Sequence, residues 1–232
     1  MKVAITSLFR TAGDGVDSYF ARMCLLDTAL KARGDSLRLI LSEGDSVDAT
    51  WERLLSNGRE LGIETVLIHK DHGGPYFGSV VNPDRFWQLS FAANAAMDAI
   101  TDDVDVWAFV ERDLMWGMAD MLKLFDRMAE VPAVCPVIIQ NTWFYDTWAY
   151  RLDGEHFRAL PPYHDGLRDP GQPPRSEMTR IDAAGSVIVM RGDLARVCRF
   201  QSEDCIVGLC RDIYKHGGSL WFDPTVIVRH PE

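Results

Sequence analysis

Two acidic residues, two positions apart, follow the most apolar stretch of the chain. The stretch covers residues 104–110, and Glu111 and Asp113 come directly after it. Such a run predicts a strand that is buried on both faces, as in a largely parallel sheet. Ligands bind outside the carboxyl ends of these strands, and residues two apart on an extended chain point the same way. Two carboxylates in one crevice suit Mg²⁺ or Mn²⁺, whereas the alternative is a pair of solvated acids in the turn before a predicted helix at 118–129.

Length and composition are those of a globular α/β protein. The chain has 232 residues, 47% of them hydrophobic and 25% charged, which is long enough for one domain with a proper core. Its formal net charge of −10 argues against a broad nucleic-acid-binding surface but leaves room for a small basic groove. No apolar run reaches the ~18–20 residues of a membrane span, and the first residues turn polar too quickly for a signal peptide.

The cysteines do not have the spacing of a zinc site. They are odd in number and form no C-x-x-C pair: Cys24, Cys135, Cys198, Cys205 and Cys210. Most lie in apolar runs, where a free cysteine behaves as a small hydrophobic residue. We therefore expect reduced core cysteines and a cytoplasmic location.

Strands and helices alternate through the first half of the chain. Strands are predicted at 2–8, 37–41, 65–69 and 104–110, and helices at about 17–33, 48–61 and 86–100. This alternation predicts a parallel sheet with right-handed crossovers. The glycine-rich loops after the first and third strands carry neither a Rossmann fingerprint nor a P-loop.

The second half has a different pattern. Further strands are predicted at 131–139, 183–190, 220–222 and 226–228, with an aromatic cluster at 143–151 and a helix that starts near 202–204. The segment 158–180 has little hydrophobic periodicity and contains five prolines, so we expect a mobile functional loop. Because there is no linker, repeat or low-complexity tract, we predict one domain. Its two halves are residues 1–116 and residues 117–232.

The order of these motifs resembles that of GT-A glycosyltransferases of the family-2 type. The triplet at 111–113 resembles their D-x-D motif, with Glu in place of the first Asp. A Gly-Ser strand at 185–191, the Glu203-Asp204 pair before a helix, a glycine pair before a strand that ends in proline, and His230 follow in order. The segment 144–151 is also similar to the F-Y-D-T-W segment of the fungal capsular mannosyltransferase-like family, which has the GT-A fold.

The resemblance implies a metal-dependent transferase that uses a nucleotide-diphosphate sugar, with UDP or GDP as the nucleotide. Residues 1–116 would bind the nucleotide sugar and residues 117–232 the acceptor. Asp113 would bind Mn²⁺ or Mg²⁺, Glu111 would bind the metal or the donor ribose, and His230 would be a further ligand. Asp204 would be the general base of an inverting transfer, with Glu203 as the alternative. Both acids could equally stabilise a helix N-terminus. The capsular mannosyltransferase likeness favours retention instead.

Other candidate residues lie at the strand ends and in the aromatic cluster. Donor-binding residues would be Ser7, Arg10, Glu43, Asp45, Arg85, Asn94 and Arg112. Acceptor-binding residues would be Tyr145, Asp146, Trp148, Arg151, Asp182 and Gly185. We expect a glycan or small-molecule acceptor, since the acidic charge disfavours a modified DNA base. A nucleotidyltransferase and a non-catalytic sugar-binding module are the competing hypotheses.

Overall fold

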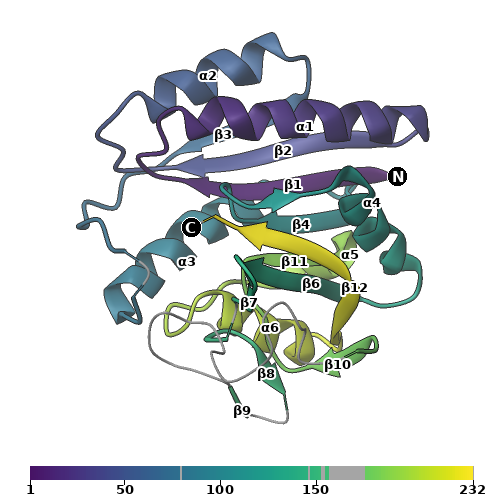
Figure 1. Ribbon diagram of the computed structural model, residues 1–232. Coiled ribbons are helices and arrows are strands. Elements are labelled where there is room, and N and C mark those ends of the chain that lie inside the picture. Colours follow the sequence, from purple (N-terminus) through teal and green to yellow (C-terminus); the bar gives the residue numbers. More distant parts are fainter. Residues whose placement is uncertain (79, 146, 153–154, 157–175, 232) are drawn as a thin grey trace.

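One large sheet runs through both halves of the chain (Figure 1). The structure is a computed structural model, and it describes residues 1–78, 80–145, 147–152, 155–156 and 176–231. The strands of this sheet are β1 (Lys2–Phe9), β2 (Ser36–Glu43), β3 (Glu64–His69), β4 (Val106–Val110), β5 (Met115–Trp116), β6 (Ala133–Gln140), β7 (Trp143–Phe144), β10 (Thr179–Ile181), β11 (Val187–Arg191) and β12 (Leu220–His230). Strands β8 (Arg151–Leu152) and β9 (Glu155–His156) form a separate small sheet.

The order of the main sheet is β10-β12-β6-β11-β4-β1-β2-β3, with β5 beside β12 and β7 beside β6. Strands β3, β2, β1 and β4 are parallel to one another, as the alternating pattern predicts. Strand β12 is parallel to β6, whereas β11 runs antiparallel between β4 and β6. The sheet is therefore mostly parallel and continuous across the two predicted halves.

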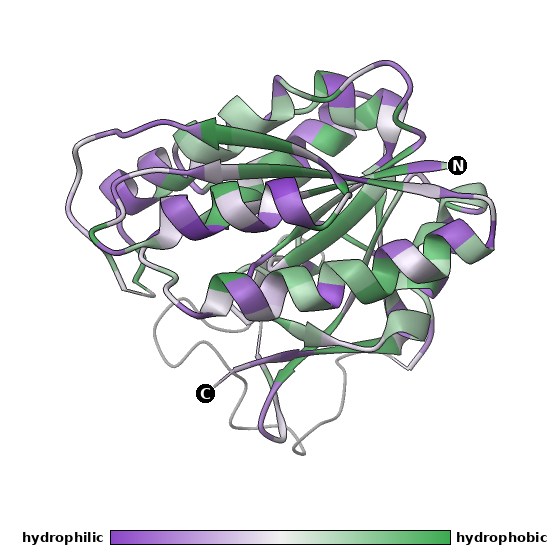
Figure 2. Cartoon of the chain, turned by 90° about the horizontal axis from the view of Figure 1, so that it is seen from above, coloured by the Kyte–Doolittle hydropathy of each residue, from purple (hydrophilic) through white to green (hydrophobic). Residues whose placement is uncertain are grey.

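Helices cover both faces of the sheet. They are α1 (Gly15–Ala32), α2 (Thr50–Glu60), α3 (Pro83–Met97), α4 (Met118–Asp126, continued by a 3₁₀ turn at Arg127–Ala129), α5 (Gly192–Val197) and α6 (Ile206–Lys215). Val3 and Ile5 pack with α1, α2 and α4, while Ala4 packs with α3, α5 and α6, because successive strand residues point to opposite faces. Figure 2 shows the hydrophobic strands enclosed between these helices.

Two predicted boundaries need correction, and one helix was missed. Helix α6 begins at Ile206, so residues 202–204 lie in the turn before it. The two closing strands are one strand, β12, whose register shifts between Asp223 and Ile227. Helix α5 was not predicted, because six residues are too few to establish a helical period.

The five cysteines form no disulfide in the described structure, and four of them are buried. Within the part of the chain that the structure describes, no helix combines the length and apolarity that a membrane crossing requires.

A buried ion pair fastens the irregular part of β12 to the turn after α4. The Asp223 side chain is fully buried, and Arg127 Nε donates to its carboxylate over 2.8 Å. Arg127→Met is expected to lower the free energy of unfolding by about 3–5 kcal/mol, because the substitution leaves a buried charge without its partner. Urea denaturation measures this change. Arg53→Met is the matched control: both of its partners, Asp14 and Asp17, are mostly exposed, so a loss of at most about 1 kcal/mol is expected.

The same carboxylate makes part of the stability depend on pH. Burial by itself raises the pKa of Asp223, but hydrogen bonds from Thr225 and the pair with Arg127 bring it below its ordinary value. A group whose pKa is lower in the folded protein stabilises the fold above its unfolded pKa, here about 4, and this stabilisation is lost as the pH falls through the folded value. Asp223→Asn is therefore expected to be less stable than the wild type in urea at neutral pH. The two midpoints should converge below about pH 4, and a constant gap would contradict the assignment.

Candidate functional site

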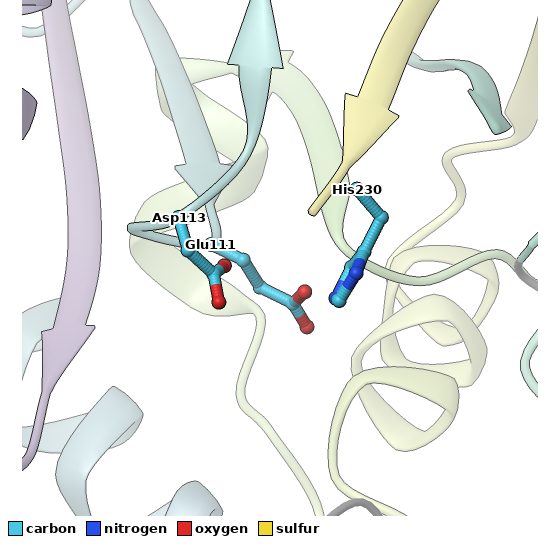
Figure 3. Close-up of side chains that lie close together, drawn as sticks. All are labelled: Glu111, Asp113 and His230. Atoms are coloured by element: carbon cyan, nitrogen blue, oxygen red, sulfur yellow. The ribbon is translucent and has the colours of Figure 1, made fainter. Parts of the chain in front are cut away.

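The chain reverses its direction directly after the Glu-Arg-Asp triplet, and this reversal builds the site. Strand β5 pairs antiparallel with β12, with Trp116 opposite Val228. The pairing brings the end of β12 close to the end of β4, although β11 and β6 lie between these strands in the sheet. As a result, His230 faces Glu111 and Asp113 (Figure 3).

The three side chains could hold a metal ion together. Glu111, Asp113 and His230 each offer one ligand atom, and these atoms lie within 4.8 Å of one another. Burial raises the pKa of Glu111, and the negative charge of Asp113 raises it further. The two acids lie in one backbone turn, in which Leu114 N–H donates to the carbonyl of Glu111 over 3.3 Å. Two like charges held in this way are relieved by a bound cation.

The His230 ring is oriented for metal binding. Its Nδ1 lies 2.8 Å from the carbonyl oxygen of Pro231. Because a carbonyl can only accept, Nδ1 carries the hydrogen, and in the neutral ring Nε2 then keeps its lone pair. Tyr145 stacks on the ring, with centroids 4.0 Å apart and planes 24° apart. Two carboxylates and one imidazole suit a first-row cation such as Mn²⁺ better than Mg²⁺, which takes mainly oxygen ligands.

A pocket of about 340 Å³ opens beside these three residues. Four basic side chains line it: Arg10, Lys70, Arg85 and Arg112. Among the described lining residues the only carboxylates are Glu111 and Asp113, so the basic side chains outnumber the acidic ones although the whole chain is acidic. The pocket is therefore suited to an anionic ligand. The acidic net charge of the whole chain did not exclude a small basic groove, and this pocket is such a groove.

Comparison with solved structures identifies the fold. A mannosyltransferase from Pyrobaculum calidifontis, PcManGT, solved with GDP-Man and Mn²⁺, superposes with a TM-score of 0.60 at 11% identity and covers 98% of this chain. S. aureus TarS 1-349 in complex with UDP superposes with a TM-score of 0.57 at 10% identity and covers all of it. The fold is GT-A. This chain spans only 56% and 61% of the lengths of those two chains.

Sequence comparison adds nothing to the GT-A assignment. No protein-family model matches the chain, and no curated protein matches it. The similarity of the segment 144–151 to fungal capsular mannosyltransferases therefore has no support.

Arg10 organises the loop that closes one side of the pocket. Its guanidinium donates to the carbonyls of Gly74 over 2.6 Å and Pro75 over 3.1 Å, and to Gln88 Oε1 over 3.1 Å. Lys70 and His72, from the same loop after β3, also line the pocket. Sequence reasoning missed them. The Gly/Pro composition of this loop, at the carboxyl edge of the sheet, was the available signal.

Asp45 supports the same loop rather than lining the pocket. Its backbone has a φ of +57°, and its carboxylate accepts from the amides of His72 over 3.1 Å and Gly73 over 3.0 Å. Burial by itself raises the pKa of Asp45, but these bonds lower it overall. His72 Nδ1 lies 2.7 Å from the carboxylate, while burial lowers the pKa of the imidazole. Asp45 thus holds the His72 side chain in place.

Besides Asp45, three more predicted donor-binding residues do not line the pocket. Ser7 is fully buried, and its hydroxyl donates to the carbonyl of Val110 over 2.6 Å. Glu43 is also buried, and its carboxylate lies 2.6 Å from His69 Nδ1. In the GT-A sheet these side chains hold neighbouring strands and loops together. Their positions at strand ends therefore serve the fold.

Asn94 is the third such residue. Its amide nitrogen donates to the carbonyl of Phe200 and its amide oxygen accepts from the Phe200 N–H, both over 2.9 Å. This pair of bonds joins α3 to the segment before α6 and occupies both ends of the amide. Asn94 therefore has a structural role in the GT-A fold and does not line the pocket.

The predicted base is engaged in an ion pair. Asp204 accepts through both carboxylate oxygens from the guanidinium of Arg211, one bond measuring 2.9 Å. Glu203 is exposed, and neither acid lines the pocket, whereas Cys205 and Ile206 do. Cys205, with a φ of +49°, stands between the two acids and the first residue of α6, Ile206. The first turn of α6 has no side-chain capping hydrogen bond, so the alternative in which the two acids cap this helix gains no support.

The predicted acceptor-binding residues separate into three groups. Tyr145, Trp148 and Gly185 line the pocket, and Trp148 stacks on Phe86 of α3 at 5.0 Å and 27°. Arg151 pairs through its backbone with Ala183, and the N–H of the exposed Asp182 donates to the carbonyl of Arg151 over 2.8 Å. Neither Arg151 nor Asp182 lines the pocket. Asp146 and most of the predicted loop 158–180 lie outside the described residues, so the predictions about them stand untested.

Proposed function

We propose that this chain is a metal-dependent glycosyltransferase that moves a sugar from a nucleotide-diphosphate donor to an acceptor hydroxyl. The observation that carries the proposal is the convergence of Glu111, Asp113 and His230 inside a basic pocket at the carboxyl edge of a GT-A sheet. The pocket pairs a cation site with positive side chains, which is the combination that a diphosphate needs. PcManGT, with its GDP-Man and Mn²⁺, supports the same interpretation by fold alone.

The roles follow from the chemistry of each side chain. Glu111, Asp113 and His230 would hold Mn²⁺, and Mg²⁺ less well. A divalent cation bound there would supply Lewis-acid stabilisation of the leaving diphosphate. Arg85 and Arg112 would bind phosphate oxygens, because guanidinium groups form paired hydrogen bonds with them.

Asp204 is the proposed base for an inverting transfer. It directly precedes the pocket-lining Cys205 and Ile206, so a short movement of the turn would bring it to the acceptor. In the described state both of its oxygens are occupied by Arg211, so the ion pair must open before Asp204 can accept a proton. Trp148 would pack against the acceptor, for which a glycan or a small molecule is proposed.

A donor-hydrolysis screen tests the proposal. The purified chain is incubated with UDP-, GDP- and dTDP-sugars in the presence of Mn²⁺, of Mg²⁺, or of a chelator, and the released nucleoside diphosphate is measured. We expect release from one nucleotide class, stimulated by Mn²⁺ and abolished by the chelator. Binding of a sugar without any release would support the sugar-binding module instead. Release of pyrophosphate from a nucleoside triphosphate would support a nucleotidyltransferase.

A further inference from the structure

The third ligand of the metal site is connected to a residue that lies outside the pocket. Gln140 is the last residue of β6, and it stands opposite His230 in the parallel pairing with β12. Its amide nitrogen donates to the carbonyl oxygen of Pro231 over 2.7 Å. The same oxygen accepts from His230 Nδ1 over 2.8 Å. Because a carbonyl oxygen has two lone pairs, it can accept both bonds at once.

Because residue 231 is a proline, its connection to β6 depends on the side chain of Gln140. Pro231 has no backbone N–H, so it cannot be tied to β6 through its own amide. Its carbonyl is instead tied to β6 by Gln140. That carbonyl in turn determines which nitrogen of His230 carries the hydrogen, and therefore whether Nε2 presents a lone pair to Glu111 and Asp113.

We propose that Gln140 is a positioning residue of the metal centre, which acts on His230 through the carbonyl of Pro231. The inference rests on the metal site of the proposed function. A histidine ligand whose other ring nitrogen donates to a fixed carbonyl keeps its tautomer and its orientation. Gln140 carries no charge, so its effect on a cation is one of geometry.

Manganese binding to the full chain tests this role without any sugar. The metal-free protein is titrated with Mn²⁺, and free Mn²⁺ is measured by electron paramagnetic resonance. Gln140→Leu is expected to weaken binding by roughly 10–100-fold, the usual effect of losing an outer partner of a metal ligand. Gln201→Leu is the matched control, since Gln201 Nε2 also donates to a carbonyl, that of Arg199, over 3.1 Å. Its affinity should stay within about twofold of the wild type.

A double-mutant cycle separates positioning from general loosening of the strand end. If Gln140 acts through His230, then adding Gln140→Leu to His230→Ala should weaken Mn²⁺ binding by no more than about twofold. An equal loss in both backgrounds would overturn the inference. So would a wild type that binds no Mn²⁺, or a Gln140→Leu variant with unchanged affinity.

The tautomer of His230 gives a second reading in the metal-free protein. Nitrogen-15 spectra, with His230 assigned by comparison with His230→Gln, should show hydrogen on Nδ1 in the wild type and a tautomer mixture in Gln140→Leu. The same single tautomer in both proteins would overturn the inference even if the variant binds metal weakly. A chain that binds Mn²⁺ as expected but releases no nucleotide from any donor would disprove the proposed function and leave the role of Gln140 standing.

Discussion

Asp113→Asn is expected to lower metal-dependent donor turnover by ~10³-fold, because charge stabilisation by a bound cation is worth several kcal/mol and each 1.4 kcal/mol is tenfold. Asp113 supplies one of only two anionic ligand groups that the described residues offer to the ion. The amide keeps the size of the side chain and removes its charge. Nucleoside diphosphate release, measured over a range of Mn²⁺ concentrations, reports both the rate and the metal requirement.

Asp102→Asn is the matched control for that substitution. Asp102 is fully exposed and lies before β4, at the opposite end of the strand from Asp113. The control should keep wild-type turnover and the wild-type Mn²⁺ requirement. Unchanged turnover in Asp113→Asn, at the same metal concentration, would remove Asp113 from the site.

Asp204→Asn is expected to slow sugar transfer by ~10²–10⁴-fold, the usual contribution of a general base. The amide cannot accept the acceptor's proton, while donor and Mn²⁺ binding should remain near the wild-type values. Transfer is measured with saturating donor and acceptor, and donor affinity is measured separately. Glu203→Gln, at the neighbouring exposed acid, should have little effect.

Arg211→Met tests whether the ion pair itself matters. Arg211 is about half exposed, so losing the pair should cost at most about 1 kcal/mol of stability. Transfer should persist in Arg211→Met, because the proposed base is retained and freed. Equal losses in Arg211→Met and Asp204→Asn would make the pair a structural support. Wild-type transfer in Asp204→Asn would favour a retaining mechanism, in which no such base is required.

The predictable part of the site comes from local signals. Glu111 and Asp113 end an apolar run, and the position of acids at a strand end of a parallel sheet follows from chain direction alone. The alternation of strands and helices likewise predicts the parallel first half. These features depend on short stretches of sequence, so they can be predicted without knowledge of contacts between distant residues.

The remaining features depend on contacts between distant segments. Ser7 and Asn94 are polar residues near the carboxyl edge, and nothing in their neighbours reveals that they bond to Val110 and Phe200. Strand β5 has two residues and therefore no period to detect. Asp204 pairs with Arg211, seven positions further along the chain, and the positive φ of Cys205 between them is a conformation for which cysteine has no preference.

The pairing of β5 with β12 also determines when the metal site can exist. His230 lies 117 residues after Asp113, on the strand that the ribosome delivers after all the others in the sheet. A nascent chain with β1 to β4 complete has both carboxylates but lacks the imidazole, and contacts between such distant residues form late because closing long loops costs entropy. Under the proposed function, manganese affinity would therefore report completed folding. A polypeptide that lost β12 through a premature stop codon would lose the imidazole ligand even if its first four strands were native.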